Sequence, residues 1–213
     1  MKNKIYPKIF MWMFIGLLIT FITGIYTSTN KDALEVIFNK GFFWIFAIVE
    51  LGVAIFLSAR IHKMSSTTAK VSYLLYTFLT GLTFSSIFIA YKLESIILVF
   101  LVTAIIFLIF SIIGYFTKID LTKLGSLLMM VLLGIIICTI INLFLGNETF
   151  DIIISSISIL IFIGFIAYDI QKIKKLEGEL PEENLAVISA FELYLDFINI
   201  FIDLLRLFGN TDD

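Results

Sequence analysis

Cysteine, histidine and proline are almost missing from this chain of 213 residues. The single cysteine, Cys138, excludes a disulfide framework within the chain, and its apolar setting is typical of a small buried side chain. The single histidine, His62, excludes a zinc site built with that cysteine, because such sites need three or four protein ligands. The two prolines, Pro7 and Pro181, are expected to lie outside helix interiors.

Charge is scarce as well. Charged residues make up 15% of the chain and hydrophobic residues 60%, with a mean hydropathy of +1.07. Soluble domains carry about 25% charged residues, so this composition indicates an integral membrane protein whose surroundings are a lipid bilayer. The net charge of −2 provides no basic face, so nucleic acid is excluded as a partner.

Seven apolar runs have the length of about 20 residues that a helix needs to cross a bilayer. They fall at residues 9–27, 42–59, 71–91, 95–116, 124–146, 152–170 and 185–208. Lipid cannot satisfy exposed backbone groups, so each run is expected to be helical. The sequence predicts an all-α membrane protein, with one seven-helix transmembrane domain over residues 1–213. The first run is too long for a signal-peptide core and lacks an A-x-A cleavage site, so a retained helix is expected.

Lysine and arginine are distributed unevenly between the two sides of this arrangement. Eleven of the fifteen fall in the N-terminal segment and the second, fourth and sixth loops, the last of these carrying Lys172, Lys174 and Lys175. The positive-inside rule then places the N-terminus in the cytoplasm and the C-terminus outside. Arg60 and Asp169 are expected at the cytoplasmic ends of the second and sixth helices.

The last run carries a stripe of polar residues, which comprises Ser189, Glu192, Asp196, Asn199, Asp203 and Arg206. Spacings of three and four residues place all six on one face of a helix. A charge at a helix centre in lipid costs at least about 2.5–3.5 kcal/mol, so this face is expected to line the bundle interior or a polar path. Asp203 and Arg206 lie nearest the outer end, and snorkelling of their side chains to the interface is a sufficient explanation for both. Asp196, near the middle, and Asp169, in the preceding run, are the main functional candidates.

A less specific interpretation remains open for these polar residues. Polar side chains also join helices in membranes without any further role, and the stripe would then be a seam between helices. Tyr76, Thr80 and Thr83 share a face of the third helix and fit such packing. Glu50, within the second run, is a stronger candidate because a carboxyl group at that position is expected to face the interior.

Three stretches match the pattern of a known family. They are LYLDFINIFIDLLRLFG at 193–209, GYFTKIDLTKLG at 114–125 followed by GIIICTIIN at 134–142, and GLTFSSIF at 81–88. Taken in their order along the chain, these stretches resemble the Bax inhibitor-1 family, also called the transmembrane Bax inhibitor motif family. The resemblance runs from about residue 42 to residue 209. It implies six helices packed around a central seventh.

The resemblance also implies a function. Bacterial members of the family are linked to a pH-dependent calcium leak, governed by two aspartates that correspond by motif position to Asp169 and Asp196. An arginine that contacts the pair corresponds to Arg60, which would act as a latch that holds the closed state. The expected function is therefore a pH-sensitive calcium or cation leak channel. Calcium would be the transported ion, with a weak site at the pair, and no cofactor is expected.

Four further residues are candidates to line the path. Glu192 and Asp203 are charges that the family pattern does not lead us to expect, and Glu50 and Asn199 complete the set. The added charges leave the aspartate pair intact but change the expected charge of the path.

Two other functions remain open. Family members have been associated with cell-death suppression and with modulation of membrane proteases, so the protein would then regulate other membrane proteins by binding them. Alternatively, Tyr168 and Asp169 resemble the YD half of intramembrane aspartyl proteases, in which two carboxyl groups activate water. Asp196 lies in LYLD rather than in the GxGD that the second half requires, so an enzyme is not expected.

Overall fold

The computed structural model describes residues 5–39 and 42–211, which form helices with no strand in these ranges. In chain order these are α1 (Ile5–Thr29), α2 (Lys31–Leu34), the π-helix η1 (Glu35–Asn39), α3 (Phe42–Arg60), the 3₁₀-helix η2 (Ile61–Lys63), α4 (Ser66–Ala90), α5 (Leu93–Phe116), α6 (Thr122–Leu145), α7 (Glu148–Leu176) and α8 (Glu182–Phe208). Among the described residues, six helices are long and apolar enough to cross a membrane: α1, α4, α5, α6, α7 and α8. The prediction of an all-α membrane protein is confirmed. The second predicted run corresponds to α3, which is not one of these six helices. The predicted count of seven membrane spans therefore stays a prediction.

Several helices extend beyond the apolar runs. α7 continues to Leu176, so the three lysines predicted for the sixth loop lie on its last turns, where positive charge interacts favourably with the helix dipole. Pro7 is the third residue of α1, within the first turn, where a missing N–H removes no helical hydrogen bond. The first loop also folds, into α2 and η1. Its start is fixed by Asn30, whose side chain accepts hydrogen bonds from the N–H groups of Asp32 and Ala33.

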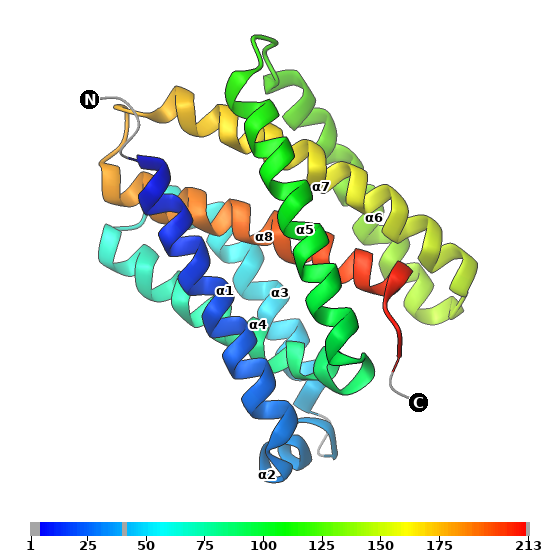
Figure 1. The fold of residues 1–213 in the computed structure, drawn as a ribbon. Helices are drawn as coiled ribbons and strands as arrows, with labels where there is room; N and C mark the ends of the chain where they lie inside the picture. Colours follow the sequence, from blue (N-terminus) through cyan, green and yellow to red (C-terminus); the bar gives the residue numbers. More distant parts are fainter. Residues whose placement is uncertain (1–4, 40–41, 212–213) are drawn as a thin grey trace. The chain divides into compact units, whose positions relative to one another are not determined.

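The chain forms two compact units that divide α8 between them. The first unit contains α1 to α4 and α8 as far as Tyr194, and the second contains α5, α6, α7 and α8 from Leu195. Figure 1 shows α8, coloured orange to red, as one continuous helix. Asp169 and Asp196 both belong to the second unit, whereas Arg60 and Glu50 belong to the first.

In the first unit, α1 and α4 lie side by side (Figure 1). Their close approach depends on Gly16, because a Cβ at this position would collide with the ring of Tyr73. Tyr73 and Tyr76 in turn pack edge-to-face against Phe191 and Tyr194 of α8, with ring centroids 5.4–6.3 Å apart. Aromatic packing therefore fixes the first half of α8 within this unit.

In the second unit, α7 packs on both α5 and α6. Gly114 of α5 lies directly on the backbone of Ala167, where any side chain would collide. The other half of α8 is held by Phe197, whose ring centroid lies 5.3 Å from that of Phe100 and 5.9 Å from that of Phe107. The contact of Gly114 with Ala167 lies two residues before Asp169 on α7.

Burial differs sharply among the six candidate spans. In the most apolar 18-residue stretch of each, 78% of α8 is buried but only 11% of α6, and the remaining four lie between 28% and 44%. α6 exposes a surface of leucine, isoleucine and methionine, which suits contact with lipid. On the face of α8 opposite its polar residues, Phe191 and Ile198 are 0% and 4% exposed, while Leu195 and Ile202 are half-buried.

Candidate functional site

The polar stripe of α8 is buried for most of its length. Ser189, Asp196 and Asp203 are 1%, 5% and 6% exposed, while Arg206 at the end is exposed. Glu192 and Asn199 are half-buried. Nδ2 of Asn199 donates one hydrogen to the carbonyl of Leu195 at 2.7 Å, and its place along a path stays a prediction.

The two main candidates are buried carboxyl groups. Asp169 is 7% exposed and lies seven residues before the end of α7, or about 10 Å at a rise of about 1.5 Å per residue. Asp196 lies fourteen residues after the start of α8, about 21 Å along the axis and close to the middle of that helix. Both belong to one unit, as their assignment to one site requires. Their approach to within one water of each other stays a prediction.

The position of Asp169 is constrained by its neighbours on α7. Ala167 is pressed against Gly114 of α5, and the ring of Tyr168 covers Gly125 of α6 so closely that a Cβ there would lie 2.5 Å from a ring carbon. The two residues that precede the aspartate are thus held from both sides. This close packing fixes the backbone of α7 directly before the position of Asp169.

A polar clamp follows Asp169 on the same helix. The amide of Gln171 donates to the carbonyl of Ile119 and accepts from the N–H of Leu121, both at 2.8 Å, and so fixes the loop between α5 and α6. Nζ of Lys175 donates to Asp120 in this loop at 2.6 Å. The Lys175 ammonium, assisted by Thr122, holds the pKa of Asp120 well below its usual range.

Arg60 is the last residue of α3 and is exposed. An exposed guanidinium at the end of a helix has the reach and permanent charge that a latch needs. Its predicted contact with Asp169 stays a prediction.

Glu50 has defined partners in the first unit. Its Oε2 lies 2.6 Å from Oγ1 of Thr83, and this hydroxyl also lies 2.9 Å from the carbonyl oxygen of Thr80. The face of α4 that the sequence suggested was packing therefore binds a carboxyl group of α3. Deeper in the same unit, the hydroxyls of Thr20 and Tyr194 lie 2.6 Å apart.

The snorkelling explanation for Asp203 is wrong. This carboxyl group is buried, has Ser158 of α7 as a polar neighbour, and lies 3.8 Å from Arg206. Arg206 also lies 3.9 Å from Asp151 at the start of α7. The reason is that Ser158 and Arg206 give the carboxyl group a polar environment inside the protein. Snorkelling still fits Arg206.

Acidic side chains do not gather into a complete metal site. Over residues 5–39 and 42–211, no three histidine, cysteine, aspartate or glutamate side chains come together. Calcium binding at the aspartate pair would therefore rest on two carboxyl groups.

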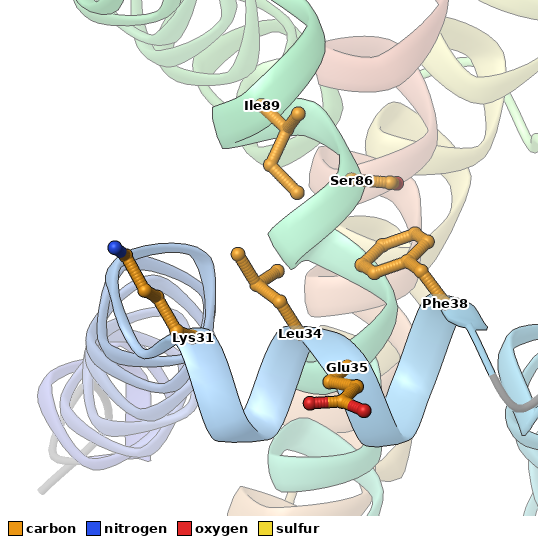
Figure 2. A pocket seen from close by; sticks show the side chains of 6 residues that line it. All are labelled: Lys31, Leu34, Glu35, Phe38, Ser86 and Ile89. Atoms are coloured by element: carbon orange, nitrogen blue, oxygen red, sulfur yellow. The ribbon is translucent and has the colours of Figure 1, made fainter.

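Outside these residues, a hollow of about 480 Å³ lies between the folded first loop and the end of α4, and Figure 2 shows the side chains that line it. It is lined by Lys31, Leu34, Glu35, Phe38, Ser86 and Ile89. Leu34 and Phe38 face Ser86 and Ile89, while Lys31 and Glu35 point outward (Figure 2). None of the residues singled out from the sequence lines it.

Ion pairs hold the start of α8 in the first unit. Nζ of Lys8 on α1 lies 2.9 Å from Glu182 and 3.2 Å from Glu183, and Nζ of Lys70 on α4 lies 2.6 Å from Glu183. All four side chains are partly exposed, so solvent screens these pairs and each contributes little to stability. Their effect is to define which residues of α1 and α4 meet the first turn of α8.

Known proteins resemble this chain over nearly its whole length. The family described as "Inhibitor of apoptosis-promoting Bax1" matches residues 2–213. A protein of Borreliella burgdorferi is 41% identical, with 98% of this chain and 92% of the relative covered. Inner membrane protein YbhL of Escherichia coli strain K12 is 38% identical, with 95% and 90% covered. A membrane protein of Streptococcus pyogenes serotype M1 is 39% identical, with 78% and 73% covered. The chain is thus a member of the Bax inhibitor-1 family of membrane proteins.

Proposed function

We propose that this protein is a pH-sensitive cation leak channel with calcium as its preferred ion. The observation that carries the proposal is the burial of Asp169 and Asp196 within one unit of a membrane protein. Ionisable groups at membrane depth are costly, and they characteristically mark ion paths and proton relays. YbhL is named an inner membrane protein, which favours the bacterial inner membrane as the location. The lysine and arginine distribution favours a cytoplasmic N-terminus.

The proposed site suits the passage of calcium ions better than their tight binding. Ca²⁺ prefers about 6–8 oxygen ligands, whereas two carboxylates supply at most about four. Water would complete the shell, and binding would be weak. Conduction requires that an ion leaves as readily as it enters, so weak binding is an advantage. Glu192 and Asp203, on the same face of α8, would add negative charge along the path.

Protonation is the proposed gate. In the closed state, Arg60 would hold an ionised Asp169. Protonation of Asp169 removes the negative charge, weakens this ion pair and frees the end of α3, so acid would favour opening. The same protonation removes charge from the path and weakens calcium binding. The direction of the pH response therefore depends on which effect is larger, and we propose that release of the latch is the larger one.

Reconstitution in liposomes loaded with a calcium dye tests the proposal. Flux would be recorded from neutral to mildly acidic pH for the wild type, Asp169→Asn and Asp196→Asn. Asparagine keeps the shape of the side chain and removes its titration, so both variants should lose the pH response while remaining folded. Asp151→Asn, an acid of α7 whose side chain is 43% exposed, is the matched control and should keep the response. Folded variants with the wild-type curve would overturn the proposal.

Regulation of other membrane proteins is a second candidate function. The family description, which names inhibition of Bax1, favours it. A regulator needs its partner, whereas a leak channel conducts alone in pure lipid. Absence of flux in liposomes, together with co-purification of one membrane protein from native membranes, would favour the regulator.

A further inference from the structure

Apart from the aspartate pair of the second unit, the carboxyl group of Glu50 in the first unit has a hydrogen bond that suits proton exchange. Oγ1 of Thr83 lies close to two acceptors, Oε2 of Glu50 at 2.6 Å and the carbonyl oxygen of Thr80 at 2.9 Å. A threonine hydroxyl has one hydrogen to donate. The Thr83 hydroxyl can therefore donate to only one of these two oxygen atoms at a time. A hydrogen bond at the other contact is possible only if the Glu50 carboxyl group itself carries a proton or the hydroxyl rotates.

Both protonation states of Glu50 fit this geometry. When Glu50 is ionised, the Thr83 hydroxyl donates to the carboxylate. When Glu50 carries a proton, the carboxylic acid donates to Oγ1 of Thr83, and the hydroxyl turns to the Thr80 carbonyl. The short contact between Glu50 and Thr83 is a hydrogen bond in either case, so gain or loss of a proton requires only rotation of one hydroxyl.

The carboxyl group is also connected to the interior of the unit. The hydroxyl of Thr80 donates to the carbonyl of Tyr76 at 3.1 Å, and the ring of Tyr76 packs edge-to-face against Phe191 and Tyr194 of α8. Tyr194 in turn shares its 2.6 Å hydrogen bond with Thr20 of α1. Thr80, Tyr194 and Thr20 are at most 1% exposed.

Tyr76 of α4 is a titratable group near Glu50, and electrostatic interaction couples the two. A hydroxyl group can both donate and accept, so Thr83 can form a hydrogen bond with Glu50 in either protonation state.

We propose that Glu50 is a proton-binding site of the first unit, with Thr83 as the group that exchanges hydrogen-bond partners when the proton binds. A hydrogen bond to a carboxylate is stronger than one from a neutral acid. Protonation therefore loosens α3 from α4, and the packing of Tyr76 against Phe191 and Tyr194 carries the change from α4 to α8. This site acts independently of the aspartate pair and does not depend on calcium conduction.

Infrared difference spectroscopy of the protein in lipid, recorded over a pH series, tests the proposal. The background carries Asp169→Asn and Asp196→Asn, so that the aspartate pair contributes no signal. We expect a carbonyl band of a protonated carboxylic acid that disappears as pH rises and is missing when Glu50→Gln is added. Spectra that are unchanged by Glu50→Gln at every pH would overturn the proposal, whatever the outcome of the flux measurements.

A second pair of variants tests the role of Thr83 and keeps Glu50 in place. Thr83→Val preserves the shape but removes the hydroxyl that donates to the carboxylate. The midpoint of the band's titration should move to higher pH by about one unit or more. Thr83→Ser keeps the hydroxyl and should restore the wild-type midpoint. Identical midpoints for the valine and serine variants would remove Thr83 from the proposed site.

Discussion

Thr20 of α1 and Tyr194 of α8 are joined by a buried hydrogen bond of 2.6 Å between their hydroxyl oxygens. Thr20 also donates to the carbonyl of Thr77 at 3.0 Å, which uses its only hydrogen. Tyr194 is therefore the donor in the shared bond. One hydroxyl of α1 thus contacts both α4 and α8, and the three helices meet at this point.

Tyr194→Phe should destabilise the protein by about 0.5–1.5 kcal/mol, the usual net contribution of one hydrogen bond. The ring and its packing against Tyr73 and Tyr76 are kept, so the loss reports the hydroxyl alone. Thermal unfolding in detergent measures it. Tyr26→Phe, at a side chain that is 65% exposed, is the control and should leave the unfolding temperature unchanged. Equal unfolding temperatures for the two variants would show that the buried bond contributes nothing.

Gly114→Ala should destabilise the second unit by about 1–3 kcal/mol, because overpacking forces backbone shifts. The new Cβ would lie 2.7 Å from Cα of Ala167, and backbone cannot move aside as a flexible side chain can. Gly134→Ala in α6 is the matched control, since nothing lies within 4 Å of its Cβ. Alanine is the better helix former by up to about 1 kcal/mol, so the control should be neutral or more stable. Unfolding temperatures that change equally in both variants would contradict the close contact of α5 with α7.

The ion pair between Asp120 and Lys175 should resist mild acid. The pKa of Asp120 is lower in the folded protein than in the unfolded chain, so its stabilising contribution is present above the ordinary aspartate pKa of about 3.9. The contribution is lost only as pH falls through the lower folded value. Between neutral and mildly acidic pH, hydrogen exchange of the loop between α5 and α6 should therefore be constant.

Asp120→Asn provides the corresponding test of function. It should speed hydrogen exchange at the amide of Thr122, which donates to Asp120 at 3.1 Å, and leave the pH dependence of calcium flux unchanged. A changed flux curve would mean that this loop, rather than the buried acids, contributes to the pH response.

Arg60→Ala should raise calcium flux at neutral pH and flatten its pH dependence, because the proposed closed state loses its ion pair. Lys63→Ala removes a nearby exposed positive charge from η2 and serves as the control. Arg60→Lys keeps the charge and should retain part of the pH response. Wild-type flux of Arg60→Ala at both neutral and mildly acidic pH would remove this residue from the mechanism.

Residues whose environment is decided within one helix were predicted best from the sequence. The spacing of the polar residues in α8 identified Asp196 as interior, and the residue is buried. Partners from distant helices were not predicted. Thr83 was grouped with packing residues because its partner, Glu50, lies 33 positions earlier on another helix. Local spacing carries no information about such a contact.

Asp203 shows a related limit. Its distance from the centre of the run predicts a position at the membrane–water interface, because this prediction considers only lipid around α8. Ser158 of α7 provides a polar environment at that level, so depth in lipid does not decide the fate of the side chain. Gln171 likewise gave no sequence signal, since the backbone groups that it clamps lie 50 and 52 positions away.

The exposed surface of α6 has a consequence for how this sequence can change over time. Only 11% of the apolar stretch of α6 is buried, so most of its side chains need only be apolar and suited to a helix. Exchanges among leucine, isoleucine, valine and methionine in α6 should hardly change the stability of the protein. The sequence of α6 should therefore differ widely between relatives from different species. α8, at 78%, has no such freedom. A saturation mutagenesis experiment would therefore recover many tolerated substitutions in α6 and few in α8, and identity to distant relatives should be weighed by helix rather than averaged over the chain.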